Sequence, residues 1–295
     1  MSALSEKVQY LDSILDTERI ISGEKNSVKN IESYYKVNHP AYRRYHSRAG
    51  FMHFRVTAGA ALSDDDIRYQ PDAVSAYVPA RARVLELGSG QGANLRYLAE
   101  RRPDSFFCGV ELFPAKLKRP PRNLRVFKQD YADLSRFPDG AFDTVYAIES
   151  LVHSSDKDGV FREIRRVLKP GGAFVAYDYA LSRPYEELDP AARKAVALIS
   201  KGGAAAMIES AEEWERHFTS NGFRREKITD LSKETLPDLE RLARTAGRVL
   251  NHPKRAKFLF RVLPKQFSNN IVLGYLGYDA CREGVGYYLE WVFRK

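Results

Sequence analysis

A glycine-rich turn flanked by acids is the first stretch of this sequence that could bind a ligand. The apolar run 84–87 contains one acid, Glu86, and three alternating glycines follow it, beginning with Gly88 and Gly90. Such glycines let a ligand lie against bare backbone, and the amphipathic segment that starts at Asn94 would present free N–H groups to it. A turn of this kind fits dinucleotides and other nucleoside cofactors equally well.

Further apolar runs follow the turn in regular order. The run 106–111 ends in Glu111, about twenty residues farther on, where an acid can accept hydrogen bonds from ribose hydroxyls. Asp130 lies at the end of the run 125–131. Runs at 142–150 and 173–179 come next, with amphipathic segments in between. This alternation predicts a parallel sheet covered by helices on both faces over residues 77–179.

The series resembles the class I S-adenosylmethionine-dependent methyltransferases over about residues 80–180. The resemblance rests on the Glu-x-Gly-x-Gly turn at 86–90 and on the Leu-Lys-Pro-Gly-Gly turn at 168–172. It implies an enzyme of the α/β class, with a Rossmann-like methyltransferase sheet, an N-terminal helical cap and an inserted helical lid. It also implies S-adenosylmethionine as the cofactor and S-adenosylhomocysteine as the product.

The same resemblance assigns roles to the residues of the turn and the strand ends. Gly88 and Gly90 would allow close approach of the methionine portion, with Glu86 near its amino group. Asp130 would lie at the adenine amino group. The residues expected at the cofactor are Glu86, Gly88, Ser89, Gly90, Asn94, Glu111, Leu112, Asp130, Tyr131 and Ile148.

The end of the fourth strand indicates the reaction. The segment 147–153 resembles the "IEA-x-x-H" segment of sterol C-methyltransferases, and Tyr34-Tyr35 resembles the "YY" opening of their N-terminal region. These enzymes methylate an isoprenoid double bond through a carbocation, which requires carboxylate or aromatic groups to stabilise positive charge and a base for the final proton. The expected catalytic set is Glu149, His153, Tyr34, Tyr35, His46 and His53, with the final base left open among them.

Basic residues in the expected cap and lid favour an anionic substrate. Clusters of this kind suit a diphosphate, and a prenyl diphosphate would undergo the same alkene chemistry as a sterol. We therefore expect C-methylation of a prenyl diphosphate, as in terpenoid biosynthesis. The alternatives are a sterol C-methyltransferase, or an O- or N-methyltransferase of another small metabolite in which His153 or His46 is the base. The basic residues are Arg43, Arg44, Arg48, Arg55, Arg244, Arg248, Lys254, Arg255 and Lys257.

Length and pattern predict four segments in the 295 residues. Residues 1–76 are expected to form the cap, 77–230 the cofactor-binding core, 231–268 the lid, and 269–295 the last helix and strand of the core. The sequence has no apolar run of about eighteen residues, and Met1 to Tyr10 has no signal-peptide core. We therefore expect no membrane span.

Composition completes these expectations. The two cysteines, Cys108 and Cys281, provide neither a disulfide framework nor a metal site, which predicts a cytoplasmic protein without a metal. The formal charge of +9 indicates an anionic partner. We expect a small isoprenoid substrate and no nucleic acid, because no long basic run with interleaved aromatic residues appears and an Asn/Asp-Pro-Pro-Tyr motif is lacking. A homodimer is possible.

Overall fold

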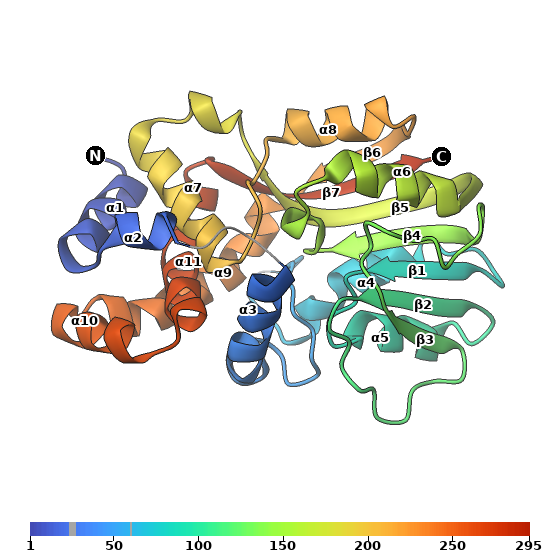
Figure 1. Ribbon diagram of the computed structural model, residues 1–295, viewed down its shortest axis with the longest axis horizontal. Coiled ribbons are helices and arrows are strands. Elements are labelled where there is room, and N and C mark those ends of the chain that lie inside the picture. The colour runs from blue at the N-terminus through green and yellow to red at the C-terminus, as the bar shows by residue number, and fades with distance from the viewer. Residues whose placement is uncertain (24–27, 60) are drawn as a thin grey trace.

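A seven-stranded sheet forms the centre of the computed structural model, which describes residues 1–23, 28–59 and 61–295 (Figure 1). The strand order is β3-β2-β1-β4-β5-β7-β6. Strands β1 to β5 are parallel to one another, whereas β7 is antiparallel to both β5 and β6. The strands are β1 (Arg83–Leu87), β2 (Phe106–Glu111), β3 (Leu124–Lys128), β4 (Phe142–Ile148), β5 (Leu168–Leu181), β6 (Arg224–Asp230) and β7 (Gly286–Arg294).

Helices cover both faces of this sheet because successive side chains along a strand point to opposite faces. In β1, Leu85 packs in a core with residues of α6 (Lys157–Val167) and α8 (Ala211–Ser220). Its neighbour Val84 packs on the other face, in a core with residues of α4 (Tyr69–Ser75) and α5 (Ala93–Arg101). The predicted α/β class and Rossmann-like sheet are confirmed.

A separate group of helices lies beyond the carboxyl ends of the parallel strands (Figure 1). One apolar cluster joins α1, α7, α9 and α11 and also includes Ala256 of α10. The chain between β6 and β7 forms three consecutive helices of this group, α9, α10 and α11. Of these, α11 packs chiefly on α9 and α7. The helices are α1 (Ala3–Ile14), α2 (Thr17–Ile21), α3 (Val28–Ala41), α7 (Pro190–Gly202), α9 (Ser232–Leu250), α10 (Pro253–Val262) and α11 (Lys265–Arg282).

Short helical turns complete the chain. A π-helical turn, η1 (Tyr42–His46), follows α3, and the turns η2 (Asp65–Arg68), η3 (Leu151–His153) and η4 (Tyr185–Glu187) are 3-10 helices. The domain limits at residues 76, 230 and 268 stay predictions. Within the described part of the chain, none of the helices has the length and apolar character required to cross a membrane.

A buried ion pair fixes the segment after η1 to α9. The guanidinium of Arg55 lies 3.3 Å from Oδ1 of Asp238, and the Arg55 backbone N–H donates to Oδ2 of the same carboxylate at 3.1 Å. Arg55 also lies 3.2 Å from Asp64 and donates to the carbonyl oxygen of His46 at 2.7 Å. Arg55 therefore joins the segment after η1 to α9 and is not available to bind a substrate anion, contrary to the expectation from the sequence.

We predict that Asp238→Asn destabilises the fold by about 3 kcal/mol, because it removes the buried carboxylate that pairs with both Arg55 and Arg241. Urea unfolding followed by circular dichroism measures the change. Asp65→Asn is the matched control, since Asp65 is exposed and pairs at 2.8 Å with a half-exposed Arg68. Equal stability of the two variants would show that the Arg55–Asp238 pair does not fix the helices.

Candidate active site

Two cavities meet at the carboxyl ends of the parallel strands. The smaller, of about 320 Å³, lies against the turn after β1, and the larger, of about 440 Å³, extends between the sheet and the helical layer. Tyr35, Met52, Glu149 and His153 line both cavities. A ligand in one cavity therefore meets a ligand in the other at these four side chains.

The smaller cavity depends on glycines of the turn. Gly88 has a φ of +67°, and a Cβ at this position would lie 2.6 Å from Cβ of Ser150. Gly90 has a φ of +49°, a backbone angle that residues with a side chain rarely adopt. All ten residues predicted to bind the cofactor line this cavity, although their contacts with the cofactor stay a prediction: Glu86, Gly88, Ser89, Gly90, Asn94, Glu111, Leu112, Asp130, Tyr131 and Ile148.

Glu86 is a buried acid with an unused acceptor at this cavity. Its Oε1 accepts a hydrogen bond from Nδ2 of Asn94 at 3.0 Å. The Tyr146 hydroxyl is a neighbour of this carboxyl group, but Oε2 accepts no hydrogen bond of good geometry from the described residues. Burial raises the pKa of Glu86 to about 8. An ammonium group placed here would satisfy the free oxygen and stabilise the charged carboxylate.

Backbone groups orient Glu111, a second acid of the small cavity. Oε2 of Glu111 accepts from the Gly90 N–H at 2.8 Å, and Oε1 accepts from the Phe113 N–H at 3.1 Å. Each carboxylate oxygen has a further lone pair for a hydroxyl. The Tyr131 hydroxyl donates to the carbonyl oxygen of Ser150 at 2.9 Å, which fixes the ring beside the turn.

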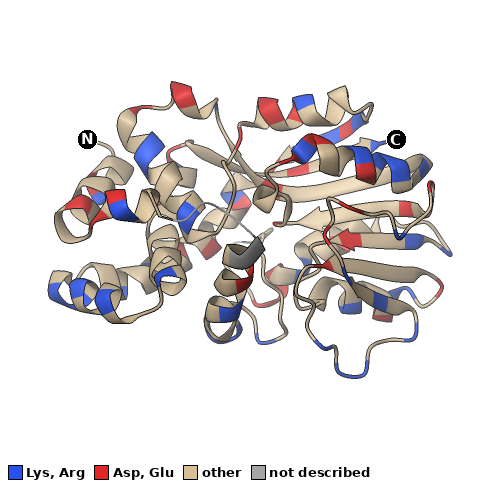
Figure 2. Cartoon of the chain, in the orientation of Figure 1, with Lys and Arg blue, Asp and Glu red and all other residues tan. Residues whose placement is uncertain are grey.

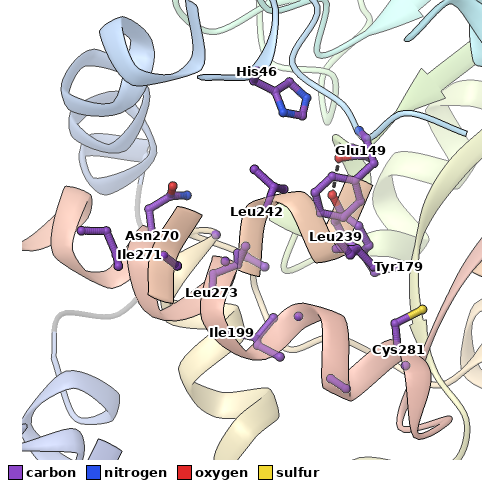
Figure 3. Close-up of a pocket in the computed structure, with 18 of the residues that line it drawn as sticks. His46, Glu149, Tyr179, Ile199, Leu239, Leu242, Asn270, Ile271, Leu273 and Cys281 are labelled. Atoms are coloured by element: carbon purple, nitrogen blue, oxygen red, sulfur yellow. Dashed lines mark hydrogen bonds between the residues drawn. The ribbon is translucent and has the colours of Figure 1, made fainter. Parts of the chain in front are cut away.

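The larger cavity is mostly apolar (Figure 3). Figure 3 shows Leu239 and Leu242 of α9 and Leu273 of α11 along its wall, with Glu149 and Tyr179 together at one end. Exposed residues at another part of the lining show that the cavity reaches the surface there. These are Tyr45, Arg248 and Arg255.

Glu149 occupies the junction in an unusual backbone conformation. Its φ is +50°, in the left-handed region that non-glycine residues rarely adopt, and its N–H donates to the carbonyl oxygen of Tyr177 at 2.7 Å. Burial raises the pKa of Glu149 to about 8. This turn directs a partly buried carboxyl group from the end of β4 into the space that the two cavities share.

Aromatic residues surround the Glu149 carboxyl group. Oε1 accepts from the Phe54 N–H at 2.7 Å and from the Tyr288 hydroxyl at 2.9 Å, and Oε2 accepts from the Tyr179 hydroxyl. Burial raises the pKa values of both tyrosines well above 10, so both remain protonated donors. The ring centroids of Phe54 and Tyr179 lie 5.5 Å apart, and those of Tyr179 and Tyr288 lie 5.8 Å apart.

These aromatic residues and Asp178 are not among the site residues predicted from the sequence. Tyr179 lies at the end of the run 173–179, so its position at a strand end was a usable signal. Tyr288 is opposite Tyr179 only through the antiparallel register of β7 and β5. Oδ2 of Asp178 accepts from the N–H groups of Leu151 and Val152 at 3.0 and 3.1 Å, which holds the turn after Glu149.

His153 pairs with Tyr35 at the same junction. Nδ1 of His153 lies 2.9 Å from the carbonyl oxygen of Ala204, which can only accept a hydrogen bond, so Nδ1 carries the proton. In the neutral ring, Nε2 then accepts from the Tyr35 hydroxyl at 2.9 Å. Burial lowers the pKa of His153, which favours this neutral form.

The remaining three predicted catalytic residues lie apart from the junction. Tyr34 and His46 line only the larger cavity, and His53 lines only the smaller. Burial lowers the pKa of His46 to about 4, and its Nε2 contacts the carbonyl oxygen of His53. Nε2 of His53 lies 3.0 Å from Oδ1 of Asn94, so a hydrogen-bonded chain links Glu86 to the segment that Arg55 anchors.

Comparison with known proteins identifies the family. Residues 85–176 match the family model described as "Methyltransferase domain". The chain is 31% identical over 224 residues to 27-O-demethylrifamycin SV methyltransferase of Amycolatopsis mediterranei, covering 70% of this chain and 79% of that protein. The chain is a class I S-adenosylmethionine-dependent methyltransferase. The free oxygen of Glu86 and the glycine turn fit the ammonium and methionine portion of that cofactor.

Two further similarities concern carbon methyltransferases. The methyltransferase is 32% identical over 150 residues to the sterol 24-C-methyltransferase of Aspergillus fumigatus, where the match covers 48% of this chain and only 39% of that protein. Its fold matches that of geranyl diphosphate C-methyltransferase from Streptomyces coelicolor A3(2), with a TM-score of 0.63, 18% identity, and coverage of 88% of this chain and 97% of that chain. The first similarity confirms the resemblance to the sterol C-methyltransferases, and the second shows a shared fold.

We predict that the affinity for S-adenosylhomocysteine depends on pH through Glu86. Below a pKa of about 8 the carboxyl group must lose its proton to bind an ammonium, so the affinity should rise almost tenfold from pH 6 to pH 7. Isothermal titration calorimetry measures it. Glu86→Gln should bind more weakly with a flat profile, whereas the exposed Glu100→Gln should behave as wild type. A flat wild-type profile would exclude this role.

Proposed function

We propose that this methyltransferase transfers the methyl group to a carbon of an isoprenoid double bond. The observation that carries the proposal is the partly buried Glu149 carboxyl group, held by aromatic residues where the two cavities meet. Sequence similarity to a sterol C-methyltransferase and structural similarity to a geranyl diphosphate C-methyltransferase support it. Neutral tyrosine rings and one acid are the groups that a carbocation needs nearby.

The residues at the junction divide the work of this reaction. The cofactor would supply a methyl group whose bond to sulfur breaks, leaving the neutral thioether, as the π electrons of the alkene form the new C–C bond. The adjacent carbon would be left with a positive charge. The Glu149 carboxylate and the faces of Phe54 and Tyr179 stabilise that charge. Glu149 is mostly protonated at neutral pH in the free protein, but positive charge in the site lowers its pKa, so the carboxylate forms when it is needed. It then accepts the final proton.

We propose a prenyl diphosphate as the substrate class. Apolar side chains of α7, α9 and α11 suit the prenyl chain, and Arg248 and Arg255, where the cavity reaches the surface, suit its anionic head group. Arg55 is excluded from this role by its ion pairs with Asp238 and Asp64. A sterol would use the same apolar wall without the arginines.

Transfer to oxygen is the second candidate, and the His153–Tyr35 pair favours it. His153 is held neutral with Nε2 toward a hydroxyl group, which is the state required of a base that deprotonates an alcohol or phenol. The similar rifamycin enzyme is named as a methyltransferase of an O-demethylated compound. In this reaction His153 would replace Glu149 as the essential group.

Incubation with methyl-labelled S-adenosylmethionine tests the proposal directly. The acceptors are prenyl diphosphates of increasing length, free sterols and phenolic metabolites. We predict label in a prenyl diphosphate, retained after the diphosphate is removed enzymatically, because a C–C bond survives this treatment. Label only in a sterol would retain carbon methylation but exclude the diphosphate. Label only in a phenol would refute carbon methylation.

We predict that Glu149→Gln abolishes turnover of the prenyl substrate and leaves the affinity for S-adenosylhomocysteine within about tenfold, or about 1.4 kcal/mol. The amide keeps the shape of the side chain but can neither carry negative charge nor accept the proton. Single-turnover assays and calorimetry measure the two effects. Glu240→Gln is the matched control, because Glu240 lies on the exposed side of α9. An equal loss of cofactor affinity would place Glu149 at the cofactor instead.

A further inference from the structure

The charged side chains of residues 241–278 are all positive. The segment contains eight lysine and arginine residues and no aspartate or glutamate. Figure 2 shows basic residues repeating along α10, at the end of the molecule away from β3. The eight are Arg241, Arg244, Arg248, Lys254, Arg255, Lys257, Arg261 and Lys265.

Helix α10 divides into three faces at the spacing of an α-helix. Ala256 is buried, and it packs with Phe260 against the cluster shared by α1, α9 and α11. Leu259 and Leu263, four apart, line the larger cavity together with Arg255. The third face is directed away from the protein.

This outer face is apolar at its centre and basic at its side. Phe258 is 62% exposed and Val262 is 56% exposed, and their spacing of four places them one above the other. Lys254, Lys257 and Arg261, all exposed, lie beside this pair on the helix. In the described part of the chain no other two large exposed apolar residues lie four apart on one helix.

The exposed pair adjoins the entrance of the larger cavity. At about 100° per residue, Phe258 and Val262 are followed around α10 by Arg255 and then by Leu259 and Leu263. Apolar surface therefore continues from the outer face of α10 into the cavity, interrupted by one arginine at the rim.

We propose that the outer face of α10, formed by Lys254, Lys257, Phe258, Arg261 and Val262, docks on an anionic lipid surface. Phe258 and Val262 enter the boundary between head groups and acyl chains, and the cations lie at the anionic head groups. Exposed apolar side chains beside cations on a helix match this interface. A nucleic acid would engage the cations but leave Val262 in water.

Docking in this way places the cavity entrance at the lipid. A prenyl chain dissolved among acyl chains can then pass along Leu259 and Leu263 without crossing water. This role in substrate entry rests on the proposed function, whereas lipid binding itself does not. The two can therefore be tested separately.

Vesicle flotation with the full-length protein tests the docking, without cofactor or substrate. We expect the protein to float with vesicles of equal parts phosphatidylglycerol and phosphatidylcholine and to stay behind with phosphatidylcholine alone. Phe258→Ser combined with Val262→Ser should reduce partitioning about tenfold. Lys257→Gln combined with Arg261→Gln should reduce it about fivefold for each charge removed, and added salt should weaken wild-type binding.

Matched variants elsewhere on the surface serve as controls. Ile228→Ser removes an exposed apolar side chain from β6, and Lys116→Gln with Lys118→Gln removes two exposed charges from the β2–β3 loop (Figure 1). Both should float as wild type, and circular dichroism should show all variants folded. Equal loss in the controls, absent flotation of wild type, or binding to RNA without binding to vesicles would each refute the proposal. None of these results would bear on the labelled-methyl assay.

Discussion

The placement of one carboxyl group where two cavities meet constrains the residues around it. Glu149 leaves β4 in a left-handed conformation, and three donors from three separate segments hold its oxygens: the Phe54 N–H and the hydroxyls of Tyr179 and Tyr288. Those donors must themselves be fixed, which requires the antiparallel pairing of β5 with β7 and the close approach of the segment around Phe54. The geometry of the junction thus depends on contacts that join distant parts of the chain.

The helical layer supplies the second half of this arrangement. Since β7 returns to the sheet only after α9, α10 and α11, the strand that carries Tyr288 and the wall of the larger cavity belong to one continuous segment. Arg55 and Asp238 then connect that wall to the backbone beside Phe54. The cavity and the acid at its end are consequently built as one unit, and neither can shift without the other.

The sequence predicted the sheet, and the residues that gather at the smaller cavity, because their signals are local. A strand, a glycine turn and an acid follow one another within a few residues, and the parallel topology then brings Glu86, Glu111 and Asp130 to one edge. The prediction that Arg55 binds an anion was wrong because its partner Asp238 is distant in the sequence and approaches it only in the folded chain. Tyr288 was missed for a similar reason, since its partner is set by strand register across more than one hundred residues.

Two acids with raised pKa values also affect the energetics of folding. For Glu86 and Glu149 the pKa is about 8 in the folded chain against an ordinary value near 4.5, so the folded state binds these protons more tightly than the unfolded state does. Their contribution to stability is therefore greatest in mild acid and is lost as the pH rises from about 4.5 to about 8. At neutral pH both acids are mostly protonated in the free protein, and a cationic ligand beside them would favour the carboxylate form. Binding of such a ligand therefore stabilises the folded protein as well as supplying a reactant.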